Sequence, residues 1–261
     1  MTAAQDSGRG ATPSLARRYA RFALVRTVLL AGLAGALVLS FLCDVATGPA
    51  ALPLADVMAG LLDRGALPRG QGVILWDVRL PYAVMAILVG AALGLAGAEM
   101  QTALNNPLAS PMTLGVSFAA TFGASLVIVL ELDLFGIGAN YAIAAGAFAG
   151  AAASTLAIHA LSRAVGAGRD TVVLFGISMF FTFNALVSLL QFIADSDALQ
   201  QIVFWTMGSL ARGSWDKLAL IAVVLAVCLP LSLRQSWSMT ALRAGDEQAR
   251  SVGIDVERLT L

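Results

Sequence analysis

The stretch Asn105-Asn106-Pro107-Leu108-Ala109-Ser110-Pro111 separates two long apolar runs of this chain. Each proline removes a backbone N–H donor and disfavours helical geometry at the residue before it. Asparagine side chains can satisfy the backbone groups that such a turn leaves without partners. The stretch is therefore predicted to be a tight link between two membrane-spanning helices.

The composition is that of an integral membrane protein. Of the 261 residues, 59% are hydrophobic and 12% are charged, and the mean hydropathy is +0.83. Soluble domains are roughly 45 to 50% apolar. The formal net charge is +0, so there is no basic excess that would suggest nucleic acid. The expected surroundings are the lipid bilayer.

Six continuous apolar runs approach the roughly 20 residues that a helix needs to cross a hydrocarbon core. They are residues 22–42, 81–101, 112–130, 141–161, 171–194 and 218–233, of which the last is the shortest. A transmembrane β-barrel would instead show segments of about 10 residues with alternating polarity. The prediction is an all-α, polytopic helical bundle over residues 22–261, preceded by a disordered cytoplasmic tail over residues 1–21.

Charges in the loops predict the orientation. Basic residues precede the first run, separate the fourth from the fifth, and follow the last: Arg17, Arg18, Arg21, Arg163, Arg169, Arg234, Arg243, Arg250 and Arg258. Acidic residues gather in the other loops. By the positive-inside rule, both ends and the link at residues 105–111 are cytoplasmic. The expected location is the bacterial cytoplasmic (inner) membrane.

Two segments on the predicted outer side are more than simple loops. Residues 54–62 are apolar enough for a short interfacial helix. Trp205 and Trp215 suit the boundary between membrane and water. Both segments are expected near the outer mouth of any pathway.

No catalytic arrangement is visible. His159 is the only histidine, which excludes a multi-histidine metal site. The phosphate-binding pattern G-x-x-x-x-G-K-[ST] is absent, so the chain is not expected to hydrolyse ATP. A membrane-embedded enzyme would need a catalytic cluster within the spans. The chain is predicted to be no enzyme and to bind no cofactor or metal of its own.

Polar side chains within the fifth run are candidate pathway residues, because they are costly in lipid. Asn184, Ser188 and Gln191 recur at helical spacing and share one face. A stripe that packs against a neighbouring helix would show the same pattern. Both interpretations remain open.

The segment after the last run is predicted to form coupling helices at about residues 239–257. Its pattern fits two short amphipathic helices broken by glycines, with Asp246 and Glu247 starting the second, where the helix dipole favours anions. A solvated loop is the alternative. The glycine at each end favours a docking element.

Several of these motifs together resemble the permeases of ABC importers for iron-siderophores, haem and cobalamin, the FecCD-type family. They are Arg79-Leu80-Pro81, Val89-Gly90-Ala91-Ala92-Leu93 with Gly97 and Gln101, Asn106-Pro107-Leu108-Ala109-Ser110-Pro111, Trp205-Thr206-Met207-Gly208, and Gly245-Asp246-Glu247 with Ala249 and Gly253. The resemblance covers residues 77–255. It makes Asn106, Pro107 and Pro111 a structural signature of the family.

The resemblance implies partners and roles. Such a permease has about ten spans and pairs with a second copy or a paralogue, with Asn184, Ser188 and Gln191 along the pathway. A cytoplasmic ABC ATPase, which uses the ATP, would dock on the coupling residues: Gly245, Asp246, Glu247, Ala249, Arg250 and Gly253. An extracytoplasmic substrate-binding protein would dock at Arg79 and Trp205.

The chain departs from the family pattern in two places. Tyr82 stands where the family commonly has a second arginine, and Leu261 falls where the family continues with about four more spans. The sequence is therefore interpreted as the first half of a permease plus its docking loop. The expected function is inward transport of a ferric siderophore or a related chelate. The alternative is a non-transporting scaffold or assembly fragment.

Overall fold

The computed structural model describes residues 15–48, 52–132, 138–166, 168–243 and 245–256, and these are helical throughout apart from short connections. The chain divides into two compact units, Met1–Ala83 and Val84–Leu261. Each unit is described by itself.

The first unit begins with a long helix, α1 (Leu15–Ala46). Then come α2 (Leu54–Leu62), α3 (Arg69–Val73) and a π-helix, η1 (Ile74–Arg79). Helix α2 confirms the helix predicted at residues 54–62. Residues 15–21 correct the predicted tail, because they are the start of α1 and not disordered chain. Residues 1–14 lie outside the described residues.

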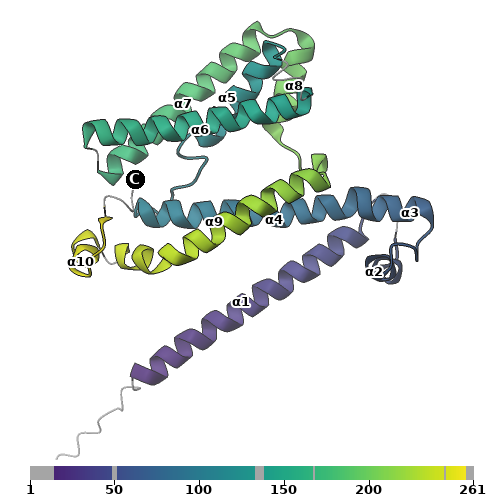
Figure 1. The fold of residues 1–261 in the computed structure, drawn as a ribbon, viewed down its shortest axis with the longest axis horizontal. Coiled ribbons are helices and arrows are strands. Elements are labelled where there is room, and N and C mark those ends of the chain that lie inside the picture. The colour runs from purple at the N-terminus through teal and green to yellow at the C-terminus, as the bar shows by residue number, and fades with distance from the viewer. Residues whose placement is uncertain (1–14, 49–51, 133–137, 167, 244, 257–261) are drawn as a thin grey trace, which may run out of the picture. The chain divides into compact units, whose positions relative to one another are not determined.

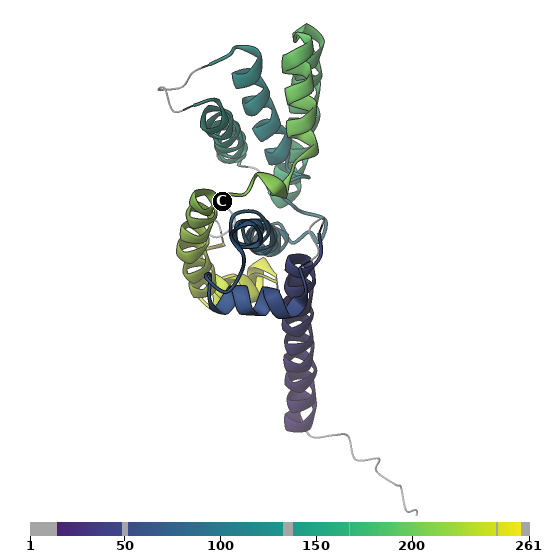
Figure 2. The same ribbon diagram turned by 90° about the vertical axis from the view of Figure 1, so that its right-hand side faces the viewer.

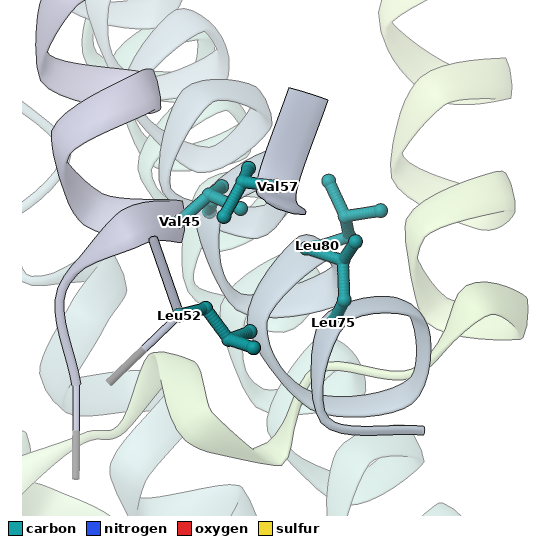
Figure 3. Close-up of a cluster of buried hydrophobic side chains, with 6 residues drawn as sticks. Val45, Leu52, Val57, Leu75 and Leu80 are labelled. Carbon is teal, nitrogen blue, oxygen red and sulfur yellow. The ribbon is translucent and has the colours of Figure 1, made fainter. Parts of the chain in front are cut away.

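The core of the first unit joins the last turn of α1 to α2 and η1. Val45, Leu52, Val57 and Leu75 are all at least nine-tenths buried, with Leu80 beside them (Figure 3). By contrast, only 6% of the most apolar window of α1 is buried. Within its unit, α1 is therefore held mainly by its C-terminal turn.

The second unit contains most of α4 (Leu80–Ala103) and all the helices after it. They are α5 (Val116–Val129), α6 (Ala139–Val165), α7 (Arg169–Ile193), α8 (Ser196–Met207), the short η2 (Leu210–Arg212), α9 (Trp215–Leu242) and α10 (Asp246–Ser251). Helices α5 to α8 lie side by side in both views (Figures 1 and 2).

Five helices within the described residues are long and apolar enough to cross a membrane. The predicted span at residues 112–130 is shorter than expected, because α5 begins only after Gly115, whose φ of 74° belongs to a turn. The span at residues 218–233 is longer than expected. Helix α9 has 28 residues and continues through polar residues that still favour a helix, and it accommodates Pro230.

Glycines let α5 and α6 cross at very short range. A Cβ on Gly123 would overlap the carbonyl oxygen of Gly146, and one on Gly150 would overlap that of Ala119. Such missing side chains supply close van der Waals contact where lipid gives no hydrophobic drive for helix association. The crossing holds the centre of the second unit together.

Candidate functional site

The link between α4 and α5 is a tightly hydrogen-bonded connector, residues 104–115. Asn105 has a φ of 47°, and the Asn106 side-chain oxygen accepts from the Leu108 N–H at 2.9 Å. The Ser110 N–H donates to Thr113 Oγ1 at 2.9 Å, and the Thr113 N–H donates to Ser110 Oγ at 3.2 Å. The predicted tight link is confirmed, and its polar side chains satisfy its own backbone.

This connector packs directly on α7. A Cβ on Gly115 would lie 2.5 Å from the backbone nitrogen of Phe180, and one on Gly176 would lie 2.8 Å from Cα of Leu114. The rings of Phe118 and Phe180 meet edge to face with centroids 4.6 Å apart. These close contacts hold the backbone of the connector at one position along α7.

A cavity of about 360 Å³ lies between the connector and α7. Its lining is mostly apolar and consists of Asn106, Leu108, Ala109, Thr113, Leu114, Val173, Ile177, Phe180 and Phe181. Leu108 and Phe181 remain largely exposed beside it. Sequence reasoning missed the α7 residues in this lining, because apolar side chains in a membrane span carry no distinguishing signal.

The polar stripe of α7 lies away from the packed side of this helix. Gly176, Val187 and Leu190 are its buried residues. Asn184 and Ser188 are exposed, and Gln191 is half-buried. The Ser188 hydroxyl donates to the Asn184 carbonyl oxygen at 3.0 Å. Within the described part of the second unit, Asn184 and Ser188 of the stripe are therefore not covered by a neighbouring helix.

A larger cavity of about 830 Å³ lies at the opposite end of the same helices. Among the described residues, three carboxylate residues line it, namely Glu131, Asp195 and Asp197. Asp195 also caps α8, because its Oδ1 accepts from the Ala198 N–H at 2.7 Å. The lining of this cavity is therefore acidic, whereas the lining of the cavity beside the connector is mostly apolar.

Glycines begin and end α10. Gly245 has a φ of 116° and Gly253 a φ of 82°, values that other residues rarely adopt. The Ile254 N–H donates to the Ala249 carbonyl and the Gly253 N–H to that of Arg250, both at 3.0 Å. This pair of bonds is a Schellman motif, which commonly ends a helix. A short helix is present where the second coupling helix was predicted, whereas the segment expected to form the first is the end of α9. The coupling role stays a prediction.

The two sides of α10 differ in burial. Ala249 is fully buried against Leu242 of α9 and Val256. Glu247 and Arg250 are exposed, as is the apolar Val252 at 59%. The side chain of Asp246 lies outside the described residues. Ala249 therefore fixes α10 on the end of α9, while Glu247, Arg250 and Val252 stay exposed.

The family model described as the FecCD transport family matches residues 36–261. The chain belongs to the FecCD transport family. Five membrane-length helices lie in the part of the chain that the structure describes, and the chain is a multi-pass protein of the inner membrane.

FecCD relatives with several named cargoes resemble the chain. It is 35% identical over 189 residues to the hemin transport system permease of Yersinia pestis, covering 72% of this chain and 56% of that one. It is 33% identical over 192 residues to the molybdate import permease of Haemophilus influenzae, covering 72% and 55%. For the vitamin B12 import permease of Vibrio cholerae, the identity is 33% over 189 residues, covering 71% and 55%. The chain spans little more than half the length of these curated relatives.

A solved structure agrees with the fold. It is an inward-facing conformation of a metal-chelate-type ABC transporter, with a TM-score of 0.72 and 28% identity, covering 90% of this chain and 69% of that one. The predicted family and all-α class are confirmed. The relatives are named as transport permeases.

The two residues predicted to dock a binding protein have different surroundings in this FecCD chain. Arg79 is only 8% exposed, and its NH1 donates to the carbonyls of Val45 at 2.8 Å and Ala46 at 3.1 Å. Trp205 is half-buried in the last turn of α8. The docking roles of Arg79 and Trp205 both stay predictions.

Proposed function

We propose that this chain serves as the membrane permease of an ABC importer that moves a ferric siderophore, or a related metal chelate such as haem or cobalamin, inward. A separate cytoplasmic ATPase provides the energy and uses the ATP, and this chain binds no cofactor. Membership of the FecCD family supports the transport role. The names of its relatives support this range of cargoes.

The observation that carries the proposal is the exposed polar stripe of α7. An amide such as Asn184 is costly against lipid hydrocarbon, so its side chain needs water or protein beside it. The packed side of α7 faces elsewhere, toward α5 and the connector. Asn184, Ser188 and Gln191 therefore line a pathway completed by a second permease copy or a paralogue.

Coupling to the ATPase takes place at α10. The positive-inside rule places this helix on the cytoplasmic side. Glu247, Arg250 and Val252 are exposed there, so they form the side that an ATPase contacts. Gly245, Ala249 and Gly253 shape and hold the helix. Asp246 starts it, where a carboxylate complements the helix dipole.

On the other side of the membrane, an extracytoplasmic binding protein delivers the substrate. The half-buried Trp205 is a candidate contact for it, since aromatic residues are favoured at interfaces. The stripe on α7 is only sparsely polar, so chelate recognition rests largely with the binding protein.

Uptake of radiolabelled ferric siderophore, haem and cobalamin tests the proposal. The chain is expressed with its ATPase and binding protein in cells that lack their own uptake systems. Asn184→Leu is expected to reduce uptake at least about tenfold, because it removes the amide from the pathway. Thr182→Leu, at an exposed polar position on the other flank of α7, is the matched control. Uptake that is equal with and without the chain, or equal in the two variants, would count against the proposal.

A further inference from the structure

Arg79 joins two parts of the chain that are far apart in sequence. It is the last residue of η1, and its NH1 donates to two carbonyl oxygens in the last turn of α1, Val45 at 2.8 Å and Ala46 at 3.1 Å. The side chain is nine-tenths buried. A buried cation needs compensating partners, and here helix carbonyls supply them.

The end of α1 leaves carbonyl groups that need partners. The last four carbonyls of a helix have no intrahelical donor and carry partial negative charge. The Cys43 carbonyl accepts from both the N–H and the hydroxyl of Thr47, at 2.8 and 2.7 Å. Those of Val45 and Ala46 accept from Arg79. The guanidinium thus acts as a C-terminal cap supplied from another helix.

The π-helix orients Arg79 for this contact. The Leu80 N–H donates to the Leu75 carbonyl five residues earlier, which makes a wider turn than an α-helix has. Leu75, Arg79 and Leu80 are consequently all buried. The two leucines belong to the cluster that also contains Val45 (Figure 3), so an apolar contact accompanies the polar one.

Gly48 leaves room for the guanidinium. A Cβ at this position would lie 2.7 Å from Arg79 NH2 and 3.1 Å from Cζ. Its φ of 153° is also one that side chains disfavour. The position of the Arg79 guanidinium therefore depends on the absence of a side chain at Gly48.

We propose that Arg79 is a positioning residue that fixes the end of α1 near Ala46 on η1. Elsewhere α1 is almost entirely exposed within its unit. The Arg79 contact consequently sets the position of α1 within the first unit. This inference does not depend on the cargo or on the transport role.

A double-mutant cycle on the full chain in detergent tests the inference through apparent melting temperatures. Arg79→Gln and Gly48→Ala are each expected to lower the melting temperature by about 3 °C or more. The double variant should lose clearly less than the sum, because the methyl group introduced at position 48 then no longer meets the guanidinium. Arg64→Gln is the matched control, since its side chain is 67% exposed and pairs with Asp77 at the surface. Additive losses, or no loss in Arg79→Gln, would overturn the inference.

Hydrogen exchange provides a second measurement that is local. In the milder variant Arg79→Lys, amides of residues 43–48 and 74–80 should exchange several-fold faster, whereas those of α5 and α6 should not change. Unchanged exchange at residues 43–48 would contradict the proposed contact. If Arg79→Gln fails to accumulate in the membrane, Arg79→Lys replaces it in the double-mutant cycle as well.

Discussion

Single glycines decide how closely α5 and α6 approach. Gly123 and Gly146 face each other with backbone against backbone, and Gly150 meets Ala119 one turn further on. Any side chain at these positions would have to displace a main-chain carbonyl, which cannot move as a flexible side chain can. These residues are therefore among the least tolerant in the second unit.

Gly123→Ala is expected to destabilise the chain by about 1 to 3 kcal/mol, the usual cost of overpacking. The measurement is the loss of monodisperse protein on heating, followed by size exclusion in detergent. Gly94→Ala in α4 is the control, because a methyl there meets nothing within 4 Å and alanine favours a helix. An equal melting temperature for Gly123→Ala and the wild type would show that the crossing is looser than described.

At the scale of elements, α10 is held from one side and open on the other. Ala249 packs between Leu242 and Val256, and the Schellman motif at Gly253 ends the helix. Val252, the residue after α10, is exposed. The buried Ala249 and the exposed Val252 can therefore be substituted separately to distinguish the position of α10 from the proposed ATPase contact.

Two substitutions in α10 should have different consequences for ATPase binding. Ala249→Leu overfills a buried site, so it should lower both the melting temperature of the chain and recovery of the ATPase. Val252→Asp should reduce recovery of the ATPase at least about fivefold while leaving the melting temperature unchanged, because Val252 is exposed. Co-purification with the tagged ATPase measures the binding, with Ser251→Ala as control. Full ATPase recovery by Val252→Asp would remove this residue from the contact.

On the scale of the whole molecule, the two ends of the second unit have different chemistry. The connector and its mostly apolar cavity lie at one end, and a cavity with three carboxylate residues lies at the other. By the positive-inside rule, the arginine distribution predicts that the first end is cytoplasmic. The orientation of the chain in the membrane can therefore be tested without any partner protein.

Native Cys43 provides this orientation test. It is exposed in the last turn of α1, which the charge distribution places outside. In Cys228→Ser, a membrane-impermeant maleimide should label Cys43 on intact spheroplasts. In a chain that lacks both cysteines, Ser236→Cys in α9 should be labelled only after permeabilisation, because Arg234 marks a cytoplasmic segment. The reverse pattern would invert the proposed topology.

Much of the fold could be predicted because membrane spans are encoded locally. Residues that are neighbours in the sequence were enough to predict the long apolar runs, the link with two prolines and the helix at residues 54–62. The ends of helices were less predictable. Helix α5 starts late because of the turn at Gly115, and α9 continues through polar residues that neither break a helix nor mark its end.

Arg79 and Ala249 show why the site was harder to predict than the fold. Sequence similarity suggested a contact with a partner for both residues, yet each is buried inside its own chain. The carbonyls that Arg79 binds lie more than thirty residues earlier. No local pattern in the sequence predicts a contact between residues so far apart.

The membrane class, the helical architecture, the connector and the family could be read from the amino-acid order alone, because these depend on hydrophobic length, proline placement and short motifs. Which side of each helix is exposed became known from the folded chain. In the folded chain, the α7 stripe lies apart from the buried residues of its helix, Ala249 is buried and Val252 is exposed. Arg79 contacts the end of α1. The physical reason is that burial depends on residues brought together by folding, and these are distant along the chain.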